Sequence, residues 1–189
     1  DSAEIFIKMF KLTQSLIKEG SIDALHDVSD GGLVSAICEL AFTARTGISI
    51  NLDSLVKDES LLNEVLFNEE IGLILQIDKS KINDITNQFN EQGLNVFVLG
   101  ELNTNDVLEI DLNDKTIFSD SIANLETIWR QTSHAIQSLR DNKKSADSEL
   151  SLVTDGYTGL FSKDSFIDPA LDNFSIKSSK PSVAILREQ

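Results

Sequence analysis

The residues best suited to chemistry lie in one short stretch, Leu-His-Asp-Val-Ser-Asp-Gly-Gly-Leu at positions 25–33. Its polar residues and glycines are His26, Asp27, Ser29, Asp30, Gly31 and Gly32. Free backbone N–H groups at a helix N-terminus attract phosphate, whereas carboxylates repel it. Asp27 and Asp30 therefore suit a phosphate site best if a hard cation such as Mg²⁺ bridges them to the anion.

The same stretch also has a purely structural interpretation. Asp and Ser are frequent at helix N-caps, and glycines are frequent in tight turns. From the residues alone, a metal–phosphate site and an ordinary strand-to-helix turn both remain open.

Hydrophobic periodicity predicts the elements that position this stretch. Apolar residues at helical spacing predict a first helix over residues 3–19, ended by Gly20. Its predicted core face consists of Ile5, Phe6, Met9, Phe10, Leu16 and Ile17. A short strand at 22–25 leads into the acidic-glycine loop, and a largely buried helix follows at 32–45, closed by Gly47.

The middle of the chain alternates short strands and helices. The first predictions are a half-buried strand at 48–52, a short helix through Leu61, Leu62 and Val65, and a central strand in the second half of 66–77. A helix at 79–92, ended by Gly93, and a strand at 96–99 follow. A hairpin of 107–112 with 116–119 is predicted to turn at Asn113-Asp114. Glu69 and Glu70 stand at the entrance of the central strand. They are candidates for paired acid–base carboxylates, and the alternative is that they bond neighbouring backbone.

A last long helix is predicted at 122–139, with His134 solvated on its outer face. Its predicted packing residues are Ile122, Leu125, Trp129, Ile136 and Leu139. Residues 141–180 show no sustained period and predict a linker that lies along another surface. The apolar run at 183–186 predicts the first strand of a further domain, so the expected division is 1–140, 141–180 and 181–189.

Composition excludes several classes of partner. The 189 residues carry a formal charge of -15, which argues against nucleic acid and anionic membrane. No apolar run is long enough for a transmembrane helix. The single cysteine, Cys38, excludes an internal disulfide, suits the reducing cytoplasm and reads as a small core residue. Because the chain begins at Asp1 without Met, we expect a piece of a longer protein.

Several motifs, taken in order, resemble phosphoribosylformylglycinamidine synthase in its large, single-chain form. They are His-Asp-Val-Ser-Asp-Gly-Gly-Leu at 26–33, Glu-Leu-Ala-Phe at 39–42, Leu-Phe-Asn-Glu-Glu-Ile-Gly at 66–72, the Trp129 helix running into Leu-Arg-Asp-Asn at 139–142, and Val-Ala-Ile-Leu-Arg-Glu-Gln at 183–189. The resemblance implies the last C-terminal-type domain of the synthetase region plus the linker to the glutamine amidotransferase domain. The implied fold class is α/β (α+β), a layered mixed sheet flanked by helices as in the C-terminal domain of aminoimidazole ribonucleotide synthase.

The resemblance also implies an activity and ligands. The family converts formylglycinamide ribonucleotide to formylglycinamidine ribonucleotide with glutamine and ATP, in cytoplasmic purine biosynthesis. The resemblance implies that Asp27 is a Mg²⁺ ligand and that Ser29, Gly31 and Gly32 contact ATP or ADP. The site that they form is either catalytic or auxiliary. His26 is expected to orient the loop, with Asp30, Glu69 and Glu70 as possible supporting residues.

The resemblance gives this segment no catalytic residue of its own, so the isolated chain is expected to be inactive. Its partners are expected to be the remaining synthetase and glutaminase domains. One alternative is a non-catalytic structural or interface module of a related ATP-using enzyme. Another is a relative such as aminoimidazole ribonucleotide synthase or a selenophosphate synthetase, against which the terminal stretch 183–189 speaks.

Overall fold

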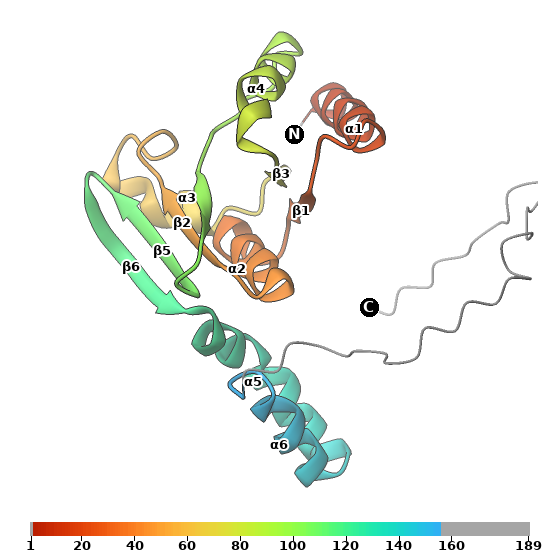
Figure 1. Ribbon diagram of the computed structural model, residues 1–189, viewed down its shortest axis with the longest axis vertical. Helices are drawn as coiled ribbons and strands as arrows, with labels where there is room; N and C mark the ends of the chain where they lie inside the picture. Colours follow the sequence, from red (N-terminus) through yellow and green to blue (C-terminus); the bar gives the residue numbers. More distant parts are fainter. Residues whose placement is uncertain (1, 156–189) are drawn as a thin grey trace, which may run out of the picture. The chain divides into compact units, whose positions relative to one another are not determined.

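The computed structural model describes residues 2–155 (Figure 1). In chain order the elements are α1 (Ala3–Lys18), β1 (Ala24–Val28), α2 (Gly32–Ala44), β2 (Gly47–Asn51), η1 (Glu59–Leu61), α3 (Leu62–Phe67), β3 (Gly72–Gln76), η2 (Lys79–Lys81), α4 (Ile82–Glu91), β4 (Gly100–Asn103), β5 (Val107–Leu112), β6 (Lys115–Ser121), α5 (Ile122–Arg140) and α6 (Lys143–Ser151). Among these helices, none is long and apolar enough to cross a membrane. The strand predicted at 183–186 lies outside the described residues.

The strands form two sheets. The larger has the order β4-β2-β5-β6, in which β2 runs parallel to β5 and antiparallel to β4, and β6 runs antiparallel to β5. The smaller is an antiparallel pair of β1 and β3. The predicted α/β class with a mixed sheet flanked by helices is confirmed.

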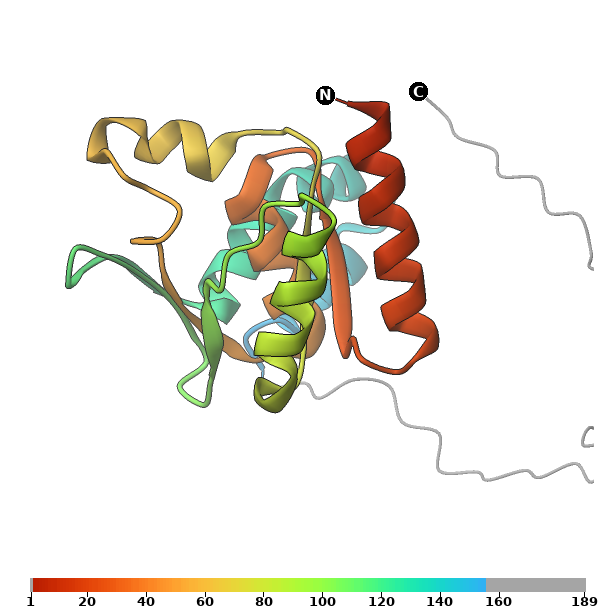
Figure 2. The ribbon, with the colours of Figure 1, turned by 90° about the horizontal axis from the view of Figure 1, so that it is seen from above.

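Two hydrophobic clusters hold these layers together. In the larger cluster, α2 packs against β2 and β5, and the side chains of Leu52 and Leu108 are fully buried. In the smaller cluster, Leu16 of α1 meets Ile85 and Phe89 of α4. The β1–β3 pair lies between the two clusters, with α2 on one side and α1 and α4 on the other (Figures 1 and 2).

Local turn signals predicted several boundaries correctly. Helices α1 and α4 each end in a Schellman motif, with Gly20 (φ 66°) and Gly93 (φ 73°) in the left-handed conformation. The hairpin of β5 and β6 turns at Asn113 and Asp114, which both have positive φ as a type I′ turn requires. By contrast, α2 ends at Ala44 with the left-handed residue Arg45 as its C-cap, and Gly47 does not close it.

Three strand predictions are wrong. The strand predicted at 22–25 lies at Ala24–Val28, because β3 supplies backbone partners as far as Val28. The predicted central strand is β3, which within residues 2–155 pairs only with β1. The strand predicted at 96–99 begins at Gly100, where the absence of a Cβ lets the chain approach the Ser49 carbonyl oxygen.

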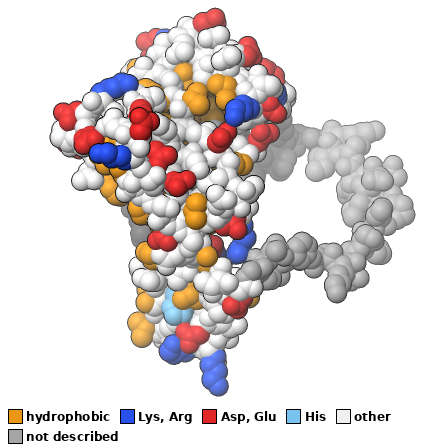
Figure 3. Space-filling model, turned by 60° about the vertical axis from the view of Figure 1, so that its left-hand side comes forward, with side chains coloured by type: hydrophobic (Ala, Val, Ile, Leu, Met, Phe, Trp, Pro, Cys, Tyr) orange, Lys and Arg blue, Asp and Glu red, His pale blue; other side chains and the backbone are white. Residues whose placement is uncertain are grey.

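The predicted packing of the two long helices is only partly correct. In α1, Leu16 is buried and Met9 is half-buried, whereas Phe6 and Phe10 are exposed. The rings of Phe6 and Phe10 stack with their centroids 6.3 Å apart. In α5, Ile122 is buried but Leu139 is 90% exposed. The remaining exposed members of the two predicted sets are Ile5, Ile17, Trp129 and Ile136. Figure 3 shows hydrophobic side chains between acidic ones on one face of the molecule.

Helix α6 occupies part of the segment predicted as a linker. It packs along α5, and its helical structure was not predicted. Asp147 of α6 contacts His134 of α5, with its Oδ1 3.0 Å from His134 Nε2. The His134 side chain is 23% exposed. The prediction of a solvated His134 is therefore wrong.

Candidate functional site

The acidic-glycine stretch forms the end of β1 and a tight turn into α2. His26, Asp27 and Val28 belong to the strand, so the loop begins at Ser29 and not after Leu25 as predicted. The Gly32 N–H donates to the Ser29 carbonyl oxygen at 2.9 Å, and Gly31 has φ 83° and ψ 2°. These values define a type II turn, which requires a positive φ at its third residue.

Strand alternation separates the two polar side chains of β1. Successive side chains of a strand point to opposite faces. His26 is 25% exposed and lies on the face of α2, whereas the Asp27 side chain is 71% exposed. Ser29 and Asp30 are exposed in the turn that follows. The structure therefore presents Asp27, Ser29 and Asp30 together at the surface.

Both glycines of the turn pack against the end of α3 and the residues that follow it. The Gly31 N–H donates to Glu69 Oε1 at 2.9 Å. A Cβ on Gly32 would lie 2.6 Å from the carbonyl carbon of Phe67, which is closer than real Cβ atoms come. The close approach that the glycines allow is thus made to the protein's own chain, and a carboxylate already sits beside the first turn of α2.

The two neighbouring glutamates behave differently. Glu69 bonds the turn across 38 residues of sequence. The backbone N–H of Glu70 donates to Asn68 Oδ1 at 2.8 Å, and its side chain is exposed. The arrangement favours the backbone-bonding interpretation of Glu69 over paired acid–base carboxylates.

Sequence reasoning assigned no role at this site to Glu39 or to Trp129, which it predicted only as a packing residue. His26 Nε2 lies 3.1 Å from Glu39 Oε2, and the Trp129 indole N–H donates to Glu39 Oε1 at 3.2 Å. The other ring nitrogen, His26 Nδ1, lies 2.6 Å from the carbonyl oxygen of Asp27. The signal that was missed is that Glu39 is the one charged residue in an otherwise uncharged helix.

The residues present fit a shared magnesium site rather than a complete one. Within residues 2–155 no group of three or more His, Cys, Asp or Glu side chains could hold a metal ion. Mg²⁺ in nucleotide sites, however, takes only one or two protein carboxylates and completes its shell with water and phosphate oxygens. The accessible Asp27 carboxylate suits that role, and Asp30 stands three residues away.

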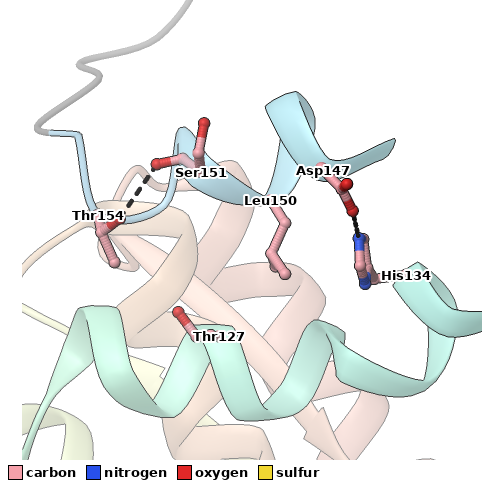
Figure 4. A pocket seen from close by; sticks show the side chains of 6 residues that line it. All are labelled: Thr127, His134, Asp147, Leu150, Ser151 and Thr154. Atoms are coloured by element: carbon pink, nitrogen blue, oxygen red, sulfur yellow. Dashed lines mark hydrogen bonds and ion pairs between the residues drawn. The ribbon is translucent and has the colours of Figure 1, made fainter. Parts of the chain in front are cut away.

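A second cluster of polar side chains, which includes His134 and Asp147, lies in a hollow between α5 and α6 (Figure 4). The hollow is lined by Thr127, His134, Asp147, Leu150, Ser151 and Thr154. Ser138 Oγ lies 3.3 Å from His134 Nε2, the same nitrogen that contacts Asp147. A nucleophilic triad needs the acid and the hydroxyl on opposite ring nitrogens, so this arrangement is not one.

Cys38 is confirmed as a packing residue. It is partly buried against the larger core. Burial, aided by the neighbouring Glu39 carboxylate, raises the pKa of the Cys38 thiol to about 11. The thiol is therefore protonated at neutral pH and a poor nucleophile.

Comparisons with known proteins agree with this architecture. The family model described as AIR synthase related protein, C-terminal domain, matches residues 4–113. Three similar solved structures come from Thermotoga maritima. They are PurL complexed with FGAR (TM-score 0.57, 18% identity), PurL complexed with ATP (TM-score 0.55, 18% identity) and phosphoribosylformylglycinamidine synthase II (TM-score 0.56, 16% identity). The match covers 62% of this chain for the first and 61% for the other two, and 20% of the solved chain in each case.

At these identities the structural likeness shows the fold alone, and the chain spans about a fifth of the length of those structures. The family model covers more than half of the chain, and its match includes β1, the turn and α2. The chain belongs to the AIR synthase related protein family, as a C-terminal domain of that type.

Proposed function

We propose that this chain supplies the last C-terminal-type domain of a phosphoribosylformylglycinamidine synthase. That enzyme is the ATP- and glutamine-dependent ligase that makes formylglycinamidine ribonucleotide in purine biosynthesis. The family match supports the domain type. The ordered motifs from residues 26–33 to 183–189 support the specific enzyme.

Within that enzyme the domain contributes part of a magnesium–nucleotide site. The observation that carries this proposal is the joint exposure of Asp27 and Ser29 at the end of β1, where the turn into α2 begins. Asp27 would hold Mg²⁺ and Ser29 would contact the nucleotide, with Gly31 and Gly32 shaping the turn. The ion would neutralise phosphate charge that a chain of formal charge -15 otherwise repels.

The remaining synthetase and glutaminase domains of the parent protein are the proposed partners, and the cytoplasm is the proposed location. Residues 2–155 contain no group of three or more His, Cys, Asp or Glu side chains that could hold a metal ion, and the thiol of Cys38 is protonated at neutral pH. We therefore expect no ligase activity from the isolated chain, even with ammonia, ATP and formylglycinamide ribonucleotide supplied.

Binding is testable with Mn²⁺ and ADP as the probe, because Mn²⁺ broadens NMR signals near its site. The amide signals of Asp27 and Ser29 should broaden first, and Asp27→Asn should raise the dissociation constant about tenfold or more. Asp23→Asn is the matched control, since Asp23 is another exposed carboxylate just before β1. Equal broadening in the wild-type chain and Asp27→Asn would refute the proposed site.

One observation favours the second candidate, a non-catalytic interface module of a related ATP-using enzyme. The Gly31 N–H is taken by Glu69 and the space beside Gly32 by Phe67, so internal packing accounts for both glycines without a nucleotide. In that case Mn²⁺ with ADP would leave the signals of residues 27–32 unchanged.

A further inference from the structure

Glu39 joins three elements that meet around the end of β1. It lies on α2, which packs against both β1 and α5 (Figure 1). One carboxylate oxygen lies 3.1 Å from His26 Nε2 on β1, and the other accepts the Trp129 indole N–H from α5 at 3.2 Å. Both oxygens of this carboxylate therefore have a partner, and the two contacts together fix the orientation of the carboxylate.

The contact continues from His26 to the backbone of Asp27. His26 Nδ1 lies 2.6 Å from the Asp27 carbonyl oxygen. A peptide plane that is held in this way also fixes the direction in which the Asp27 side chain leaves the strand. The Asp27 carboxylate itself is 71% exposed and stays available to a ligand.

We propose that Glu39 is a positioning residue for Asp27, acting through the imidazole of His26. The proposal rests on the proposed function in one respect, that Asp27 is the metal ligand. Residues that do not touch a metal ion can still orient its ligands through such a chain of polar contacts. The Glu39 and His26 side chains are 32% and 25% exposed, so water screens their contact less than it screens an exposed ion pair.

The rest of the turn is held independently of Glu39. Glu69 bonds the Gly31 N–H, and Ser29 accepts from the Gly32 N–H. Those two bonds fix the part of the loop that follows Ser29. Glu39 therefore acts on the end of the strand, and its loss should affect Asp27 more than Gly31.

The single tryptophan of the chain makes the test direct, because its indole N–H gives one NMR signal. Glu39→Gln keeps the size of the side chain but replaces one of the two carboxylate oxygens with an NH2 group, which cannot accept a hydrogen bond. The contact that this oxygen makes with His26 or with Trp129 is therefore changed. The substitution should shift the indole signal and the amide signals of Asp27 and Val28, and raise the dissociation constant of Mn²⁺ with ADP about tenfold.

Two variants separate positioning from general packing. Trp129→Phe removes the indole donor, together with part of the ring that packs on Phe42. Because the contact between Glu39 and His26 remains, the Asp27 amide signal should stay in place. Glu91→Gln is the matched control, an exposed helical glutamate on α4 that should change nothing. If Glu39→Gln lowers the melting temperature too far for study, His26→Gln should displace the same Asp27 signal.

The outcomes distinguish the two proposals. An Asp27 amide that stays in place in Glu39→Gln overturns the positioning role, whatever the affinity for Mn²⁺. A displaced Asp27 amide in Glu39→Gln, with affinity unchanged in Asp27→Asn, supports the positioning role and refutes Asp27 as the metal ligand.

Discussion

Glu69 Oε1 lies 2.9 Å from the backbone nitrogen of Gly31 and accepts its hydrogen bond. The bond joins the segment after α3 to the turn before α2, two places separated by 38 residues. It also places a negative charge beside the first turn of α2, where the helix dipole favours one. The turn is thus held by a carboxylate from the chain itself.

Replacing Glu69 should therefore destabilise the turn by a predictable amount. Glu69→Ala leaves the Gly31 N–H without its protein acceptor, and the loss of one such bond costs about 0.5–1.5 kcal/mol. The measurement is the free energy of unfolding from urea denaturation. Glu70→Ala is the matched control, because the Glu70 side chain is exposed and the bond to Gly31 is made by Glu69. Its effect should stay within about 0.5 kcal/mol.

Gly32 should tolerate a methyl group far less than Gly20. Both residues have positive φ, 72° and 66°, so alanine is strained at either position. A Cβ at Gly32 also collides with the Phe67 backbone, whereas a Cβ at Gly20 meets no atom within 4 Å. We expect Gly20→Ala to cost about 1 kcal/mol and Gly32→Ala more than about 3 kcal/mol, since its collision is added to the strain.

Thermal or urea unfolding of the two variants measures that difference. Equal losses would mean that only backbone strain matters, and that the segment after α3 moves away from α2 at little cost. Such a result would contradict the close packing of Gly32 on Phe67.

Local signals in the sequence were sufficient for most helices and for the tight turns. Gly20, Gly93 and the Asn113-Asp114 pair act through their own backbone conformations, which sequence reveals directly. Strand limits depend on partners elsewhere in the chain. The β-branched residues at 96 and 98 suggested a strand, but regular pairing with β2 begins at Gly100, which fits against Ser49.

The candidate site was predicted in the same uneven way. Asp27 and Ser29 were chosen as candidates because they are close together in the sequence and carry a carboxylate and a hydroxyl. The contacts of Glu39 with His26 and Trp129 were missed because they span 13 and 90 residues of sequence. No periodicity reveals which helix face will meet a given strand, so such contacts need the fold.

Cys38 should react slowly with alkylating agents while the protein is folded. Burial raises the pKa of its thiol to about 11, and the thiolate is the reactive species. Compared with an ordinary cysteine of pKa about 8.5, the thiolate fraction at pH 8 falls by roughly two orders of magnitude. Alkylation by iodoacetamide, followed by mass spectrometry, should be slow in buffer and fast in about 8 M urea. Unfolding in urea exposes the thiol, and its pKa returns to about 8.5. Equal rates in the two solvents would contradict the buried environment.

The packing of α6 on α5 should weaken in acid. Hydrogen bonds from Lys143 and then from His134 hold the pKa of the Asp147 carboxyl below its ordinary value. A carboxyl whose pKa is lowered by folding stabilises the folded state at pH values above the pKa that it has in the unfolded chain, about 3.9. This stabilisation is lost as the pH falls through the lower pKa of the folded state. We therefore expect full protection of the α6 amides at pH 6 and a loss of protection below about pH 4.

Hydrogen exchange of residues 143–151, followed by NMR between pH 3 and pH 6, measures this loss after correction for intrinsic exchange rates. Asp147→Asn carries no titrating carboxyl, so its α6 should be less protected at pH 6 and should change little on acidification. Glu149→Gln serves as the control on the same helix, because Glu149 bonds Gln137 and neither Lys143 nor His134. It should keep the acid-dependent step of the wild-type chain. A step that persists in Asp147→Asn would assign the acid sensitivity to another carboxyl and contradict the role of Asp147 in joining α6 to α5.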